Sequence, residues 1–352
     1  MEPTISRRRF IGISAAVAGL DLVPFGGIAH ADSSVVIWRG QAMGAVANLQ
    51  IHHHDRSVAK RLIERAVAET QRLERVFSLY REDSAIVALN RHGVLVAPPK
   101  DMVDLLGECR RYFDLTGGAF DPTVQAFWTL HRSHFSQADA AAKGPPQHAL
   151  DEARGKIGFN HVSVGRDRIS FPRGMSLTLN GIAQGYITDR IVDLLRSEGI
   201  DRSIVDMGET RAIGPRPDGG PWRVGIVDPG QPARIGDQLE IINQAVATSA
   251  GYGFRFDAAG AFNHLFDPVT GQSANRYLSV TAVMETATAA DALSTAFSLM
   301  PQEAIGIALR SQGNDRVHLV VAEGKSTIMR AGQIRPNTPG LAAVGSLEPQ
   351  TR

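Results

Sequence analysis

The stretch Leu177–Asp189, LTLNGIAQGYITD, decides how the rest of the chain is interpreted. Alternating apolar residues at 175–179 predict a strand that stops at Asn180, and an apolar pattern of helical period begins almost at once. Gly181 and Gly185 leave the backbone uncovered there, and free N–H groups near the start of a helix suit a phosphate. A tight turn between a strand and a helix explains the same spacing more simply.

The composition is that of an ordinary globular chain. Its 352 residues are 43% hydrophobic and 21% charged, which is enough for two packed lobes or one large one. A formal charge of +1 and the lack of a basic stripe argue against nucleic acid as a partner. Cys109 is the only cysteine, so an internal disulfide and a cysteine-ligated metal are excluded.

Residues 1–31 have the pattern of an export signal. Residues 6–11, SRRRFI, form a twin-arginine motif, and Ala29-His30-Ala31 is typical of a cleavage site. The apolar run at 11–20 is too short to span the ~30 Å of a bilayer, although a membrane anchor is the alternative. We therefore predict export by the twin-arginine translocase to the periplasm, with the mature chain starting near Asp32.

The remaining periodicity predicts strands and helices without strict alternation, so we expect an α+β fold of mixed sheets with flanking helices. Strands are predicted in a hairpin at 35–51 with its turn at 40–44, and at 162–164, 169–171, 203–207, 222–227, 239–247, 278–284 and 317–321. Helices are predicted at 56–77, 99–115, 184–197, 289–300 and 302–311. We expect a long loop at 208–220, a mobile insertion or lobe boundary at 136–146, one domain over 32–335, and a loose tail at 336–352.

A carboxylate and a hydroxyl are spaced for one helix face near residue 290. Asp291 and Thr295 are four residues apart, so their side chains lie one above the other on a helix. Two such oxygens suit a hard cation such as Mg²⁺. Helix capping by Thr288 or Asp291 is the alternative, and taken alone it is the simpler explanation.

Two further loops carry polar residues. His264 directly precedes Asp267-Pro-Val-Thr-Gly271, a turn signature, and a histidine here could act as a general base or be merely structural. Residues 247–251, ATSAG, are small and hydroxylic after a predicted strand, which a simple turn also explains.

The order of these and other motifs is much more specific than any one of them. Nine motifs follow one another with plausible gaps over roughly residues 35–321, and together they resemble the FAD:protein FMN transferase family, the ApbE-type flavin transferases. The motifs are MGA at Met43, FSLYREDS at Phe77, TGGAFDPTV at Thr116, LNGIAQGY at Leu179, VDMGE at Val205, WRVGIVDP at Trp222, ATSAGY at Ala247, NHLFDPVTG at Asn263 and ADALSTA at Ala290.

The resemblance implies a two-lobed fold and a reaction. Family members bind FAD with Mg²⁺ on its pyrophosphate and transfer the FMN half to a Thr or Ser hydroxyl of a target protein, releasing AMP. By motif, Asp291, Thr295 and the carbonyl of Gly181 would bind Mg²⁺, and His264 would be the base. The FAD-binding residues would be Met43, Tyr80, Ala119, Phe120, Asp121, Thr178, Gln184 and Leu265. The implied acceptor is a flavoprotein of a respiratory membrane complex.

Three positions depart from the family pattern. The family usually has Asp where this chain has Thr178, Lys or Glu where it has Gln184, and MGT where Ala45 makes MGA. Two other functions stay open. One is a periplasmic FAD-binding carrier without transfer, and the other is Mg²⁺-dependent hydrolysis of FAD to FMN and AMP.

Overall fold

The structure is a computed structural model that describes residues 16–18, 35–310, 315–320 and 326–330. Most of the predicted export signal and the whole of the predicted tail at 336–352 lie outside the described residues. Within the described ranges, no helix combines the length and apolarity that a membrane crossing requires. The described elements form antiparallel sheets with flanking helices, which confirms the α+β prediction.

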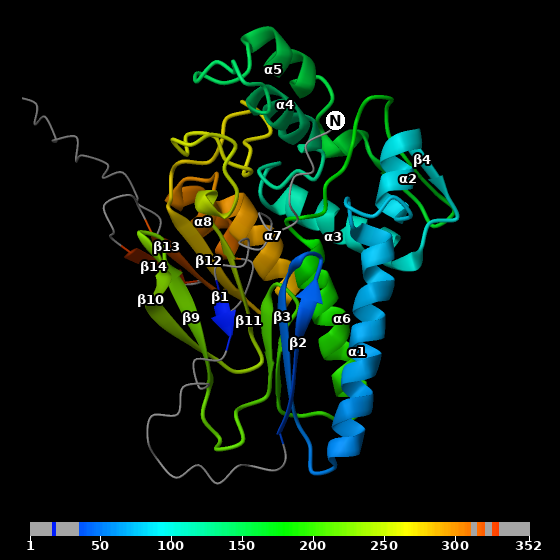
Figure 1. Ribbon diagram of the computed structural model, residues 1–352, viewed down its shortest axis with the longest axis vertical. Coiled ribbons are helices and arrows are strands. Elements are labelled where there is room, and N and C mark those ends of the chain that lie inside the picture. The colour runs from blue at the N-terminus through cyan, green and yellow to red at the C-terminus, as the bar shows by residue number, and fades with distance from the viewer. Residues whose placement is uncertain (1–15, 19–34, 311–314, 321–325, 331–352) are drawn as a thin grey trace, which may run out of the picture.

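An eight-stranded antiparallel sheet runs through the centre of the molecule (Figure 1). Its order is β14-β13-β12-β11-β8-β7-β3-β2. The strands are β2 (Val35–Ala42), β3 (Ala45–His52), β7 (Ser203–Asp206), β8 (Thr210–Ile213), β11 (Ala245–Ser249), β12 (Ser279–Met284), β13 (Arg316–Val320) and β14 (Ser326–Arg330).

The inner strands of this sheet are covered on both faces. On one face Val205, Ala247 and Ala282 belong to the main helical core, whereas Ile204 and Val246 on the other face pack against a smaller sheet. Side chains alternate between faces along a strand, so both residues of each adjacent pair are buried. This is why the inner strands are almost uniformly buried instead of alternating between apolar and polar.

Helices cover the first face, and α1, α6 and α7 lie nearest the sheet (Figure 1). Residues spaced at helical period along α1, from Ala59 to Phe77, are buried, and Cys109 of α3 is buried as predicted. The helices are α1 (Arg56–Phe77), α2 (Ala85–His92), α3 (Lys100–Leu115), α6 (Ala183–Ser197), α7 (Ala287–Phe297) and α8 (Gln302–Leu309).

Two three-stranded sheets and a pair of helices complete the described fold. The helix pair forms a lobe at one end of the molecule (Figure 1). Aromatic rings of α4 and of residues 254–266 pack together there. The sheets are β1 (Ala16–Ala18), β9 (Trp222–Asp228) and β10 (Gln231–Ile241), and β4 (Val94–Val96), β6 (Arg168–Ser170) and β5 (Ser163–Val164). The helices are α4 (Gln125–Phe135) and α5 (Gln147–Arg154), and short 3₁₀ turns lie at Phe159–His161 and Gly251–Gly253.

Several predicted boundaries are wrong. The expected loop at 208–220 contains β8, and the expected single strand at 239–247 is two strands in different sheets, broken where Asn243 has a φ of 52°. Segment 136–146 joins α4 to α5 inside one lobe and is not a boundary between lobes. The sequence analysis also missed α2, α4, α5, β1, β4 and β14.

The predicted strand before Asn180 belongs to no sheet. Leu177 is fully buried, but its backbone N–H and C=O are bonded to the side-chain amide of Asn90 at 2.7 and 2.8 Å, and Thr178 N–H donates to the Pro122 carbonyl at 2.8 Å. An amide side chain therefore replaces a neighbouring strand as hydrogen-bond partner of this extended segment.

Candidate active site

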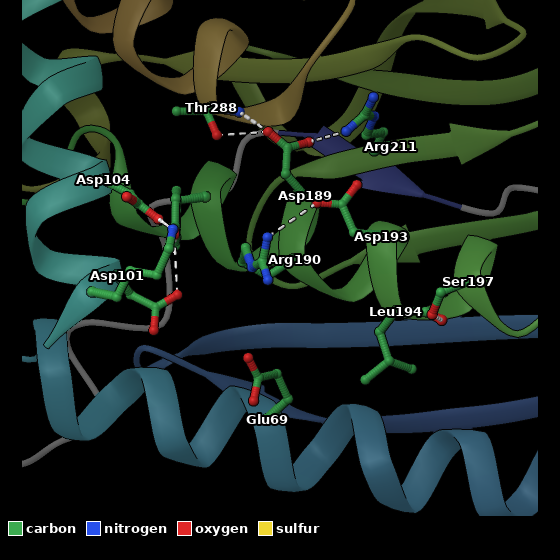
Figure 2. A network of polar contacts seen from close by, with 12 residues as sticks. Glu69, Asp101, Asp104, Asp189, Arg190, Asp193, Leu194, Ser197, Arg211 and Thr288 are labelled. Atoms are coloured by element: carbon green, nitrogen blue, oxygen red, sulfur yellow. Dashed lines mark hydrogen bonds and ion pairs between the residues drawn. The ribbon is translucent and has the colours of Figure 1, made fainter.

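The crossing of α6 and α7 is fixed by a buried carboxylate. Asp189 of α6 accepts hydrogen bonds from the N–H groups of Ala287 and Thr288 at 2.9 and 2.8 Å and from the Thr288 hydroxyl at 2.6 Å. Figure 2 shows Asp189 between Thr288 and Arg211, whose Nη1 lies 2.5 Å from it. The carboxylate thus caps the start of α7, where free N–H groups favour negative charge, and it sets the position of that helix.

A glycine lets the two helices approach closely. A Cβ atom at Gly185 would lie 2.2 Å from the carbonyl oxygen of Ala287, closer than atoms can pack. The N–H of Gly185 donates to Asp291 Oδ2 at 3.0 Å instead of continuing the helix toward the carbonyl of Gly181. No backbone N–H of the described residues donates to that Gly181 carbonyl, so it is free to accept another partner.

Asp291 does not cap its own helix. The N-cap residue of α7 within its own chain segment is Thr286, whose hydroxyl accepts the N–H of Ala289 at 3.2 Å, beside the bonds that Asp189 of α6 accepts, so the capping alternatives for Thr288 and Asp291 are wrong. Thr295 lies one turn beyond Asp291, and its Oγ1 would be 3.0 Å from a Cβ at Gly181. Gly181, Asp291 and Thr295, which are up to 114 positions apart in sequence, therefore meet at one place.

A cavity opens above this meeting point. Its wall comes from the segment after α3, the start of α4, the α6 junction, the turn between β7 and β8, the end of β11, the 254–266 segment and α7. The lining residues are Ala119, Phe120, Asp121, Pro122, Val124, Gln125, Trp128, Thr178, Asn180, Gly181, Gln184, Glu209, Thr248, Ser249, Ala250, Phe254, His264, Leu265, Phe266, Asp291, Thr295 and Leu299.

All but two of the predicted site residues line this cavity. Met43 occupies the tip of the β2–β3 hairpin, which turns only at residues 43 and 44, and its N–H donates to Glu74 at 2.7 Å. Tyr80 does not line the cavity either, but it hydrogen-bonds Asn180, which does. Tyr80 therefore contacts a residue of the wall without belonging to it, and Met43 lies outside the wall.

The carboxylate of Asp121 makes structural hydrogen bonds. One oxygen accepts the N–H of Thr123 at 2.8 Å and its hydroxyl at 2.5 Å, and the other accepts the N–H of Phe159 at 3.1 Å. Burial raises the pKa of Asp121 despite these bonds. Its side chain therefore holds the loop at 119–122 in shape, and this loop then faces the cavity with its backbone and with Phe120.

His264 is held as a neutral imidazole. Its Nδ1 lies 3.3 Å from the carbonyl oxygen of Phe254, which can only accept, so Nδ1 carries the proton and Nε2 keeps its lone pair. Burial lowers the pKa of His264, which keeps the ring uncharged near neutral pH. The Asp267 turn beside it forms as predicted, because Asp267 Oδ1 accepts the N–H groups of Val269 and Thr270 at 2.8 and 3.0 Å.

The sequence analysis missed Glu209. It follows the turn after β7, in a segment expected to be a loop, and its carboxyl lines the cavity although the residue is only 5% exposed. The motif VDMGE contained it, but a single acidic residue in a predicted loop gives no sign of burial. The cavity wall therefore carries three acidic residues, Asp121, Glu209 and Asp291, and among its described residues no Lys or Arg.

This donor set fits a divalent cation. The described residues contain no group of three or more His, Cys, Asp or Glu side chains arranged for a metal, so a site here has to include other oxygens. Asp291, the Thr295 hydroxyl and the free Gly181 carbonyl offer oxygen ligands of the kinds that Mg²⁺ takes. Amides at the junction are mostly engaged, since Ile182 and Ala183 donate to the Leu179 carbonyl at 3.1 and 2.8 Å. A phosphate in this cavity would therefore be bound mainly by a cation, because few N–H groups at the start of α6 are free to bind it.

The buried carboxyls predict an unusual pH dependence of stability. Burial raises the pKa of Asp206 and of Asp291 to about 7, above the 3.8 of an exposed aspartate. The folded metal-free protein then keeps protons that the unfolded chain loses between about pH 4 and 7, so its stability falls as the pH rises through that window. Each group contributes roughly 2 kcal/mol of loss between pH 5.5 and 7.

Urea unfolding of EDTA-treated protein at pH 5.5 and pH 8 checks this expectation. The metal-free protein is expected to have the larger free energy of unfolding at pH 5.5, and Mg²⁺ is expected to stabilise it mainly at pH 8. A metal-free protein that is equally or more stable at pH 8 would contradict the expectation.

Comparisons with known proteins agree with one another. The model of the ApbE family matches residues 43–319. The FAD:protein FMN transferase of Escherichia coli (strain K12) is 27% identical over 338 residues, which cover 93% of this chain and 95% of that protein. The FAD:protein FMN transferase of Treponema pallidum (strain Nichols) is 32% identical over 269 residues, or 68% of this chain and 72% of that one.

Solved structures give the same picture. The flavin transferase ApbE from Vibrio cholerae has a TM-score of 0.71 at 26% identity, with 85% of this chain and 97% of that chain covered. The ApbE protein from Thermotoga maritima has a TM-score of 0.72 at 28% identity, with the same coverage of 85% and 97%. The likeness therefore extends over most of the fold.

Proposed function

This chain belongs to the ApbE family, a family of transferases, and on that premise we propose that it transfers FMN from FAD to a Thr or Ser hydroxyl of an acceptor flavoprotein, with Mg²⁺ and with release of AMP. One observation carries the proposal. A single cavity joins the oxygen groups of Gly181, Asp291 and Thr295 to a neutral histidine, His264. The relatives named FAD:protein FMN transferase support the choice of substrate.

The cavity suits a flavin dinucleotide in two respects. Phe120, Trp128, Phe254 and Phe266 present aromatic rings that flat heterocycles can stack on. The pyrophosphate carries negative charge into a wall that has acidic residues and no described Lys or Arg, so the anion needs a bound cation as its partner.

Mg²⁺ is the cation that the donors fit. Asp291, the Thr295 hydroxyl and the Gly181 carbonyl would hold it, and when bound it would neutralise charge on the pyrophosphate oxygens. The chain supports these donors from behind. Gly185 N–H orients the Asp291 carboxylate at 3.0 Å, and the Ser249 hydroxyl lies 3.3 Å from Thr295 Oγ1.

His264 is proposed to take the proton of the acceptor. A bond forms between the acceptor hydroxyl oxygen and the FMN phosphorus, the bond from that phosphorus to the AMP phosphate oxygen breaks, and AMP leaves with the electron pair. The hydroxyl proton passes to Nε2 of His264. The Phe254 carbonyl then stabilises the charged ring through Nδ1–H.

We also propose that the reaction takes place in the periplasm. The twin-arginine motif at residues 6–11 and the cleavage pattern at 29–31 support export of the folded protein by the twin-arginine translocase. An exported enzyme would meet an acceptor flavoprotein of a respiratory membrane complex on the same side of the membrane.

One assay tests the proposal. The protein without residues 1–31 is incubated with FAD and Mg²⁺, with and without an acceptor domain, and AMP release is measured beside acceptor fluorescence that survives denaturation. Equal amounts of AMP and labelled acceptor are expected, with both abolished by EDTA. His264→Asn should still bind FAD in the presence of Mg²⁺ but should label the acceptor much more slowly.

The other candidate functions give different outcomes in the same assay. Stoichiometric AMP release without labelling of any acceptor would favour an FAD hydrolase. Tight FAD binding with no AMP would favour a carrier, and it would direct attention to Thr178 and Gln184, which face the cavity where the family pattern has charged residues.

A further inference from the structure

One buried acidic side chain in the cavity has no role in the proposed reaction. Glu209 follows the turn between β7 and β8, where Gly208 has a φ of 108° and packs so closely on Gln184 that a Cβ would lie 2.5 Å from Gln184 Nε2. The backbone carbonyl of Glu209 accepts the Thr188 hydroxyl at 2.9 Å. The backbone of Glu209 is therefore held by hydrogen bonds, whereas its carboxyl is free for another role.

The carboxyl of Glu209 has no partner among the described residues. It makes neither a hydrogen bond nor an ion pair there, although the residue is buried, with only 5% of its surface exposed. The Gln184 amide beside it, at 6% exposure, also faces the cavity with no side-chain hydrogen bond within the described chain. Buried polar groups are normally paired, so two unpartnered ones side by side point to a ligand that completes them.

The charges around Glu209 make an unassisted carboxylate costly. Burial raises the pKa of Glu209 well above its ordinary value, and the nearby charges of Asp291 and Asp206 raise it further. The nearest buried cation in the sequence, Arg211, is engaged by Asp189. Two adjacent buried carboxylates without a basic partner are balanced in charge by one divalent cation.

We propose that Glu209 is a further residue of the divalent-cation site, where its carboxylate binds Mg²⁺ directly or through a water molecule and, with Asp291, balances its two positive charges. The unpartnered Gln184 amide faces the same space and can bond a water or a phosphate oxygen there. The inference rests on the proposed function only in taking Mg²⁺ to be the cation. The proposed ligands Asp291, Thr295 and Gly181 include only one carboxylate, and Glu209 would supply a second.

Glu209→Gln tests the inference with Mg²⁺ alone, in the absence of FAD. Binding is followed by isothermal titration with MgCl₂ and by the Mg²⁺-induced rise in melting temperature. We expect the variant to bind Mg²⁺ about 10-fold or more weakly, the range seen when a supporting metal-site carboxylate is lost. We also expect the metal-free variant to melt at a higher temperature than the metal-free parent at pH 8, because the variant no longer has to bury an unpaired charge or keep a proton that the unfolded chain releases.

Asp206→Asn is the matched control. Asp206 is also a buried acid near Glu209 but does not line the cavity, and its carboxylate accepts the Gly208 N–H at 3.0 Å, so Mg²⁺ affinity should not change. The inference is overturned if Glu209→Gln binds Mg²⁺ like the parent, if it loses stability without metal, or if the parent shows no response to Mg²⁺.

The outcome is separable from that of the proposed function. A parent protein that labels an acceptor while Glu209→Gln keeps its Mg²⁺ affinity would refute the inference and leave the transferase. A Glu209→Gln variant that loses Mg²⁺ affinity, in a protein that never releases AMP from FAD, would support the cation site and refute the transferase.

Discussion

Replacing Asp291 by Asn is expected to slow FMN transfer by about 10³-fold, since charge stabilisation by a bound metal is worth several kcal/mol in the transition state. The substitution removes the negative charge from the proposed cation site but keeps the shape of the side chain. An amide oxygen can still accept the Gly185 N–H, which Asp291 Oδ2 accepts at 3.0 Å, so α6 and α7 should stay in place.

Initial rates of acceptor labelling at saturating FAD, measured over a range of Mg²⁺ concentrations, check this prediction. Asp193→Asn is the matched control, because Asp193 is an aspartate of α6 whose side chain is 54% exposed and, among the described residues, forms an ion pair with Arg190 alone, at 3.4 Å. The control should label like the parent. A loss of less than about 10-fold in Asp291→Asn, in a protein with an unchanged melting temperature, would mean that Asp291 serves packing and not the cation.

The parts of the site that could be predicted are those whose spacing is local. Asp291 and Thr295 share a helix face by their four-residue separation, and the helix forms over both. The turn at Asp267 follows from Asp-Pro and Gly alone. The abrupt change of period located the junction at Gly181, and the helix does begin two residues later, at Ala183, whereas the role of the Gly181 carbonyl came only from the family resemblance.

The parts that could not be predicted depend on partners far away in sequence. The extended segment before Asn180 has the pattern of a strand, but its backbone partner is the side chain of Asn90, 87 positions earlier. Strand β8 is hidden because Arg211 at its centre is charged and still buried. The ion pair with Asp189 makes that burial possible, and no pattern in the sequence near Arg211 indicates this ion pair.

Glu209 and Met43 show that local pattern alone does not determine which residues line the cavity: Glu209 lines it but was not predicted, and Met43 was predicted but does not line it. Glu209 lies next to β8, so missing the strand hid a carboxyl that the fold carries into the cavity wall. Met43 belongs to a motif of the family pattern, yet the hairpin places it at a turn outside that wall. Motif order was thus enough to predict the family, whereas the composition of the cavity needed the tertiary fold.

Replacing Asp189 by Ala is expected to destabilise the protein by about 3–5 kcal/mol, the range found when one partner of a buried ion pair is removed. Arg211 would be left as a buried charge, and its Nε already has no hydrogen-bond partner in the described structure. The start of α7 would lose the acceptor of the Ala287 and Thr288 N–H groups (Figure 2). Transfer activity should fall as well, because α7 carries Asp291 and Thr295.

Urea unfolding followed by circular dichroism measures this loss, and a double variant separates its two causes. Asp189→Ala with Arg211→Leu removes both charges, so it should recover the part of the loss that comes from the unpaired guanidinium. The remainder is the value of the carboxylate as a cap of α7. Asp193→Ala, which removes an exposed carboxylate from the same helix, should leave the free energy of unfolding almost unchanged. If the double variant is no more stable than Asp189→Ala, the unpaired guanidinium accounts for none of the loss, and the cap of α7 accounts for it.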